Sequence, residues 1–140
     1  NKTKGIDYCF LLNHKHVYNN MFPINSTDRL IFVNINNSYE AFIYNRRTSS
    51  YFRESLYDCT VKYWRISEKK AAMATHIIGC YKGKVVEVVK INSFNTIKSE
   101  EYFGRKVFEG IEEPNSQYMG FDIRDLYDSL ANFIVRYWNY

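Results

Sequence analysis

His-Ile-Ile-Gly-Cys-Tyr-Lys-Gly-Lys-Val-Val-Glu-Val-Val-Lys-Ile, residues 76–91, is the stretch of sequence that decides the fold. Two apolar runs, residues 77–81 and 85–91, flank a Lys-Gly pair, and Gly83 can adopt the positive φ that a tight hairpin turn requires. The second run is nearly continuously apolar, which is typical of a strand covered on both faces. The pattern therefore predicts an antiparallel hairpin, with residues 85–91 as a central strand of a sheet.

A short helix is predicted immediately before this hairpin, over residues 67–74. Ser67 can cap its amino end, and Glu68 complements the positive charge of the first turn. The alanines that follow have high helix propensity. Because a helix of this length does not persist alone in water, it must pack against the rest of the domain.

The residues on either side of this region predict further short strands. The cluster Asn34-Ile35-Asn36-Asn37-Ser38 is typical of a turn, and residues 39–44 are expected to pair across it with the preceding strand. Residues 46–57 and 122–130 do not decide between helix and irregular structure. Runs rich in β-branched and aromatic residues place strands at residues 6–12, 30–35, 105–111 and 133–138.

The length of 140 residues fits a single domain over residues 1–140, and the apolar fraction of 46% is enough to bury a core. Several short strands with a few short helices predict an α+β fold. The expected architecture is a small, mixed, mostly antiparallel β-barrel whose openings are covered by helices.

The composition also bears on location. No run of eighteen apolar residues is present, so we expect no membrane contact, and residues 1–5 lack the apolar core of a signal peptide. The cysteines Cys9, Cys59 and Cys80 are odd in number and widely spaced, which fits neither a disulfide framework nor a CxxC zinc site. We therefore expect free, mostly buried thiols in a cytoplasmic protein.

Signatures of catalytic and metal sites are missing. His14-Lys15-His16 would place two imidazoles on one face of a strand, but no nearby carboxylate or cysteine completes a ligand set. Glu87 and Lys90 are separated by two residues, which sends them to opposite faces of a strand and does not fit the E-x-K unit of nucleases. Phosphate-binding loops, nucleophile elbows and the zinc-deaminase pattern do not occur. We therefore expect no metal, no cofactor and no catalytic residue.

The net charge of +4 is unevenly distributed. Residues 62–90 contain seven lysines or arginines and two glutamates, whereas residues 91–140 contain five basic and eight acidic residues. A basic segment is typical of a surface that contacts a polyanion such as nucleic acid, although an ordinary solvated face gives the same pattern.

Aromatic and basic residues alternate within the first of three clusters, residues 57–67. Tyr63 and Trp64 offer ring faces on which bases could stack, while Lys62 and Arg65 could reach phosphate. The alternative is that these aromatic residues, which lie next to strands, belong to the core.

The other two clusters lie in the carboxyl-terminal part of the chain. Residues 104–110 form a basic, aromatic and acidic strand that holds Arg105 between two glycines, where backbone can approach a partner closely. Residues 132–139 combine Arg136 with three aromatic residues.

At these clusters the sequence resembles the PUA-like superfamily, the small β-barrels that include the PUA, ASCH, EVE, YTH and SRA domains. The likeness is clearest over residues 55–139 and is greatest to uncharacterised bacterial domains, often met in phage or restriction contexts. The shared order is an aromatic-Trp-Arg-Ile-Ser start, a short Ala-rich helix, a strand–Gly–strand hairpin, a Gly-Arg-x-x-Phe-x-Gly strand and a final Arg-Tyr strand. Here these pieces are residues 63–67, 69–74, 77–91, 104–110 and 132–139.

The resemblance implies a nucleic-acid reader, because PUA-like domains bind RNA, or DNA with a modified base, in or beside the barrel mouth. Several flip a base into an aromatic-lined pocket, where stacking offsets the cost of unstacking. On this likeness, Trp64 and Ser67 would line the pocket, and Arg105 would contact phosphate or a base. The EVE-type tryptophan motif and the YTH-type aromatic cage are missing, so the identity of the base does not transfer.

The leading hypothesis is a non-catalytic nucleic-acid-binding module that recognises a modified or flipped base and works with a protein partner such as a nuclease. The alternatives are a protein-interaction or inhibitor domain in a phage or defence context, and a small hydrolase of ASCH type. The predicted nucleic-acid-binding residues are Tyr63, Trp64, Arg65, Ser67, Lys69, Lys70, Lys82, Lys84, Arg105 and Arg136.

Overall fold

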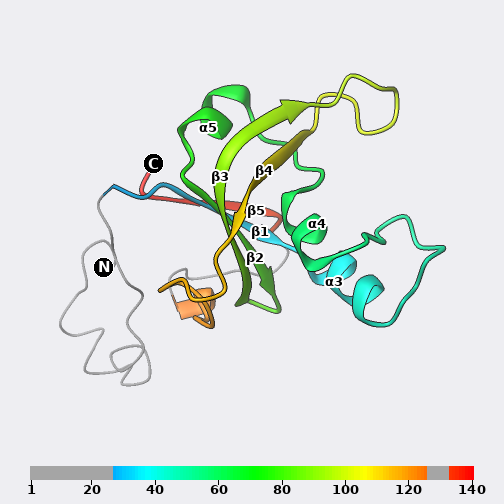
Figure 1. Cartoon of the computed structure of the whole chain (residues 1–140), viewed down its shortest axis with the longest axis horizontal. Coiled ribbons are helices and arrows are strands. Elements are labelled where there is room, and N and C mark those ends of the chain that lie inside the picture. Colours follow the sequence, from blue (N-terminus) through cyan, green and yellow to red (C-terminus); the bar gives the residue numbers. More distant parts are fainter. Residues whose placement is uncertain (1–26, 126–132) are drawn as a thin grey trace.

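A twisted five-stranded sheet forms the centre of the molecule (Figure 1). The computed structural model describes residues 27–125 and 133–140. The strand order is β4-β3-β2-β1-β5; β1 and β2 are parallel, and the other three pairs are antiparallel. The strands are β1 (Leu30–Asn34), β2 (His76–Tyr81), β3 (Lys84–Thr96), β4 (Lys106–Glu112) and β5 (Val135–Trp138).

Three helices connect β1 to β2 and cover one face of the sheet (Figure 1). They are α3 (Asn36–Ile43), α4 (Leu56–Val61) and α5 (Glu68–Met73). A connection of this kind is needed because two parallel neighbouring strands cannot be joined by a tight turn. Alternate residues of the strands, including Ile31, Ile77 and Val89, meet the helices in one buried cluster.

The opposite face of the sheet is covered by irregular segments. Leu30, Phe32 and Ile78 point to this face and pack against Tyr118 and Phe133. The 3-10 turn η1 (Ile123–Asp125) adds a further buried contact. Both faces of the central strands are therefore buried, which explains the nearly continuous apolar run of β3.

The predicted hairpin and the predicted helix are confirmed. Tyr81 pairs with Lys84 across the two-residue turn, where Lys82 and Gly83 have φ values of 51° and 86°. Positive φ at both positions matches the twist of an antiparallel hairpin. The helix prediction is borne out by α5, because the Ser67 hydroxyl accepts the N–H of Lys70 at 3.2 Å.

The prediction of a strand over residues 39–44 is wrong, because residues 39–43 belong to α3 and Tyr44 is its C-cap. The Asn34 side chain accepts the N–H of Asn36 at 2.8 Å and so turns the chain out of β1. The two edges of β1 are already paired with β2 and β5, so no third strand can join it. The neighbouring segment 46–57, which the sequence left undecided, leads into α4 at its end.

The prediction of a closed barrel is also wrong for the part of the chain that the structure describes. Strands were expected at residues 105–111 and 133–138 and are present as β4 and β5, but they lie at opposite edges and do not pair. The outer edge of β4 is instead paired at its first residue with the backbone of Trp64, which exchanges hydrogen bonds of 3.0 and 2.8 Å with Lys106. The predicted strand at residues 6–12 and the segment 126–130 lie outside the described residues.

Candidate functional site

Two tyrosine rings stack at the end of the sheet where β3 leads into β4. Tyr63 follows α4, and Tyr102 lies in the loop of residues 97–105 that joins the two strands. Their ring centroids are 4.1 Å apart and their planes differ by 9°. The Tyr102 hydroxyl donates to the carbonyl oxygen of Ser50 at 3.5 Å, so this contact joins three separate segments of the chain.

Two arginines flank the stacked rings. The guanidinium of Arg53 lies 4.9 Å from the Tyr63 centroid and 5.9 Å from the Tyr102 centroid. The guanidinium of Arg105 lies 5.5 Å from the Tyr102 centroid, and its Nη1 donates to the Tyr63 carbonyl oxygen at 3.5 Å. Contacts of this type hold a cation beside the negative face of a ring. We call these four residues the arginine–tyrosine cluster.

The positive charge of the cluster is not neutralised by carboxylates. Among the described residues, neither Arg53 nor Arg105 lies within 4.0 Å of an acidic side chain. Arg53 Nη1 donates to the carbonyl oxygens of Ser50 and Phe52 at 3.0 and 2.9 Å, which leaves its charge unpaired. A negatively charged group would therefore find two free cationic charges beside aromatic rings.

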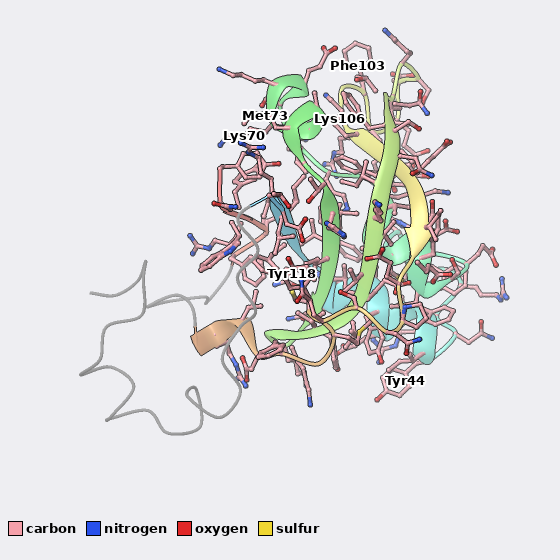
Figure 2. The ribbon with its side chains drawn as sticks, turned by 60° about the vertical axis from the view of Figure 1, so that its left-hand side comes forward. Tyr44, Lys70, Met73, Phe103, Lys106 and Tyr118 are labelled. Atoms are coloured by element: carbon pink, nitrogen blue, oxygen red, sulfur yellow. The ribbon has the colours of Figure 1, made fainter. Side chains whose placement is uncertain are left out.

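Lys106 brings a third cation to this end of the sheet (Figure 2). Its side chain is only 6% exposed, and its Nζ donates to the carbonyl oxygen of Gly104 at 3.3 Å. No carboxylate of the described residues lies within ion-pair distance of it. Since a buried charge is poorly screened by water, Lys106 raises the positive potential near the cluster.

Trp64, a predicted base-stacking residue, lies between the arginine–tyrosine cluster and the core covered by the helices. Its indole Nε1 donates to the carbonyl oxygen of Thr60 at 2.7 Å, and its ring packs against the helix-covered core. The backbone pairing of Trp64 with Lys106 fixes the start of β4 and thereby the position of Arg105. Its packing corresponds to the core alternative that the sequence left open.

A groove of about 430 Å³ runs between α4 and the edge of β4. Lys62, Asn92 and Glu109 contribute polar groups to its lining. The Nζ of Lys62 lies 5.8 Å from the Tyr63 centroid and 3.8 Å from Asp58 Oδ1, so the groove begins next to the cluster.

Four other predicted residues lie on or just before α5, at the same end of the sheet (Figure 1). Arg65 and Lys69 are exposed. The Ser67 hydroxyl is engaged by its own helix, as described above. The Nζ of Lys70 lies 4.2 Å from the ring centroid of Tyr137 on β5, a contact within the fold.

The remaining three predicted residues lie elsewhere. Lys82 lies in the β2–β3 turn and Lys84 directly follows it. This turn is separated from α5 by the length of β2, about 20 Å at 3.3 Å per residue. Arg136 is half-buried on β5 and pairs with Phe32 of β1. The basic segment of residues 62–90 is therefore not one continuous face.

A cavity of about 420 Å³ on the other side of the sheet was not indicated by the sequence. Four of its lining residues form two side-chain pairs, one between His76 and Glu113 and one between Tyr118 and Asp28. His76 Nε2 lies 3.3 Å from Glu113 Oε1, and the Tyr118 hydroxyl donates to Asp28 Oδ2. Burial, together with the bond to Asp28, raises the pKa of Tyr118. We call this the His76–Tyr118 cavity.

Glu87 is a buried acid. The sequence correctly predicted that it lies on the face of its strand opposite to Lys90, but it did not predict the burial of Glu87. Glu87 is 4% exposed and faces the helices, whereas Lys90 is exposed on the other side of β3, as predicted. Burial raises the pKa of Glu87 to about 8, and the neighbouring Glu112 carboxyl raises it further. Its Oε2 has no hydrogen-bond partner among the described residues.

The predicted absence of disulfides can be examined for two cysteines. Cys59 and Cys80 are free and buried, and burial raises the pKa of both thiols. Cys9 and the residues 14–16 lie outside the described part of the chain. Within residues 27–125 and 133–140, no group of three or more histidine, cysteine or acidic side chains is arranged to hold a metal ion.

Two members of the arginine–tyrosine cluster were missed from the sequence. Tyr102 lies two residues before the Gly104-Arg105 motif and has a φ of 62°, a left-handed conformation that the sequence pattern did not suggest. Arg53 lies in the segment that the sequence left undecided. Its position depends on the chain folding back toward β4, a long-range contact without a local signal.

Comparisons with protein-family models, curated proteins and solved structures found no match to this chain. Across the described residues, none of the helices has both the length and the apolar character that a bilayer crossing requires.

Proposed function

We propose that this domain is a non-catalytic nucleic-acid-binding module that makes contact through the arginine–tyrosine cluster. The observation that carries the proposal is the pair of guanidinium groups, Arg53 and Arg105, that lie beside stacked tyrosines without a carboxylate partner. Guanidinium groups bind phosphate through charge-assisted hydrogen bonds. Aromatic rings and guanidinium planes are surfaces on which unpaired bases stack.

The groove between α4 and β4 supports a preference for unpaired nucleotides. It opens next to Tyr63 and offers the amide of Asn92 to a nucleotide, whereas the ammonium group of Lys62 already faces Asp58. A base can enter such a groove only when it is not stacked within a duplex. We therefore expect single-stranded DNA or RNA to bind more tightly than a regular duplex of the same sequence.

The proposal is tested by measuring oligonucleotide affinity at several salt concentrations, by fluorescence anisotropy. Arg105→Gln should weaken binding to all sequences and reduce the slope of log affinity against log salt by about 0.7–0.9, the contribution of one phosphate contact. Lys84→Gln is the matched control, because it removes one positive charge at the start of β3, far from Arg105 at the β3–β4 loop. Equal effects of the two substitutions would show a general charge effect and contradict the cluster as the site.

The recognition of a modified or flipped base, and a nuclease partner, stay predictions from the PUA-like resemblance. A screen of modified and unmodified DNA and RNA oligonucleotides at one salt concentration tests the first. Affinity that depends on the modification would support a reader of modified bases. Equal affinity would restrict the contact to the backbone and to sequence-independent stacking.

The His76–Tyr118 cavity favours a small hydrolase as a second candidate. Glu113 can orient the imidazole of His76, and a histidine so placed can act in general acid–base catalysis. Turnover of nucleosides or acylated nucleosides by the wild-type protein, lost in His76→Gln, would support this candidate. Absence of turnover in the wild type would reject it.

The protein-interaction alternative gives the opposite result in the binding experiment. A domain that uses its aromatic surface for a protein partner would show no salt-dependent binding to any oligonucleotide.

A further inference from the structure

Phe103 lies at the tip of the 97–105 loop, next to the arginine–tyrosine cluster. Its side chain is 68% exposed, more than that of any other large apolar residue described. Figure 2 shows it at the outer end of the molecule, beyond the end of the sheet. Single exposed apolar residues are common on protein surfaces, so the argument rests on how Phe103 is held and on what surrounds it.

The backbone on both sides of Phe103 is fixed. The N–H of Gly104 donates to the Ile97 carbonyl oxygen at 2.9 Å, and the N–H of Arg105 donates to the Tyr102 carbonyl oxygen at 3.0 Å. Tyr102 and Gly104 have φ values of 62° and 83°, so the chain reverses sharply on each side of Phe103. The stacking of Tyr102 on Tyr63 anchors the base of the loop. Hydrogen bonds and ring stacking therefore hold the turn that carries Phe103 in one conformation.

Charged groups close to Phe103 suggest the kind of partner. Arg105 is two residues away and Arg53 contacts the same tyrosine stack, both without carboxylate partners among the described residues. An apolar ring flanked by unpaired cations complements a polymer with flat apolar bases and a negative backbone. Glu100 and Glu101 are exposed in the same loop and would repel a longer polyanion, which limits the contact to a few nucleotides.

We propose that Phe103 inserts between two neighbouring bases of nucleic acid held at the arginine–tyrosine cluster. The inference rests on the proposed function. Inserted apolar side chains separate adjacent bases and replace part of the stacking that is lost. The arginines would hold the phosphates on either side of the opened step, and the separated base would lie close to the groove between α4 and β4.

The test uses single-stranded DNA and RNA oligonucleotides that carry 2-aminopurine, whose fluorescence rises when its neighbours unstack. Phe103→Ala should lower affinity by about 5- to 150-fold, the effect of losing one stacked base, and abolish the fluorescence increase. The salt slope should not change, because no charge is removed. Phe103→Leu keeps an apolar side chain that can still enter the step but offers no ring for stacking, so it should retain more of the fluorescence increase than Phe103→Ala.

Ile134→Ala is the matched control, because Ile134 is 66% exposed and precedes β5 at the opposite edge of the sheet. It should leave affinity and fluorescence unchanged. If the wild type binds and Phe103→Ala retains the same affinity and fluorescence, the insertion is overturned while the proposed function stands. If the wild type binds no oligonucleotide, the proposed function fails and the insertion fails with it. A melting temperature of Phe103→Ala equal to that of the wild type excludes unfolding as the cause.

Discussion

The arginines near the two ends of β3 have opposite kinds of partner. At the β2–β3 turn, Arg124 holds Asp122 through contacts of 2.5–3.2 Å, and this hydrogen bonding lowers the pKa of Asp122. Arg46 lies 4.0 Å from Glu40 on the same side of the molecule. At the β3–β4 loop, Arg53 and Arg105 contact only rings and carbonyl oxygens among the described residues.

This difference distinguishes cations that already have a carboxylate partner from cations that are available to bind an anion. A cation that already faces a carboxylate gains little from a phosphate, because the phosphate must compete with the existing partner. A cation held by a ring keeps its full charge and needs no rearrangement to bind an anion. The number of basic residues in a segment is therefore a poorer guide to a binding surface than the partners these residues have.

The largest effect on stability is expected from replacing Trp64, whose ring packs beneath the β3–β4 loop end of the sheet. Trp64→Ala should lower the free energy of unfolding by about 3–5 kcal/mol, because a packed ring is lost from the core. Trp64→Phe should cost about 1 kcal/mol for the lost bond to Thr60, together with a small loss of packing. Urea denaturation measures both values. Equal stability of Trp64→Ala and the wild type would mean that the ring does not support β4.

The next prediction concerns an acid without a basic partner. Because the pKa of Glu87 is raised to about 8 in the folded protein, its stabilising contribution is complete below its ordinary pKa of 4.5. That contribution declines as the pH rises through 8. Glu87→Gln stays neutral and should flatten the dependence of melting temperature on pH between 5 and 9. Glu109→Gln removes an exposed carboxylate of β4 and should leave the slope nearly as in the wild type.

A smaller effect on stability is expected from alanine substitutions in the turns at the two ends of β3. Gly83 and Gly104 have φ values of 86° and 83°, so alanine at either position is strained by about 1–2 kcal/mol. A Cβ on Gly83 would also lie 2.7 Å from the Arg124 side chain, whereas a Cβ on Gly104 meets nothing within 4 Å. Gly83→Ala should therefore lower the melting temperature more than Gly104→Ala. Equal melting temperatures of the two variants would mean that Arg124 moves aside without cost.

The smallest effect is expected at Lys70, a predicted phosphate contact that the fold places over Tyr137. Lys70→Gln should lower the free energy of unfolding by about 0.5–1 kcal/mol, the value of an exposed cation–π contact. Lys69→Gln lies one residue away on α5 and should leave stability unchanged. If Lys70→Gln reduces the salt slope of oligonucleotide binding as much as Arg105→Gln does, the nucleic-acid surface extends onto α5.

Local signals in the sequence were sufficient for part of the fold. The Lys82-Gly83 turn and the cap at Ser67 are decided by residues that are neighbours in the chain, and both were predicted correctly. Residues 39–44 were predicted to be a strand because their aromatic residues favour strands. The structure places residues 39–43 in α3, and the bond from the Asn36 N–H to the Asn34 side chain, which starts this helix, depends on backbone geometry.

The candidate site was predicted only in part. Tyr63 and Arg105 were named from their motifs, and the structure brings them together. Arg53 and Tyr102 complete the cluster through contacts between segments far apart in the sequence, which a local pattern does not encode. For the same reason the charge of residues 62–90 did not reveal that β2 separates Lys82 from α5.

The position of β1 in the sheet has a consequence for biosynthesis. Leu30 pairs with His76 on one side and with Trp138 on the other, so both edges of the earliest described strand wait for partners that leave the ribosome much later. Until β5 emerges, β1 presents an apolar, unpaired edge on which another nascent chain can dock. We expect slow translation of residues 76–138 to increase aggregation of the nascent chain.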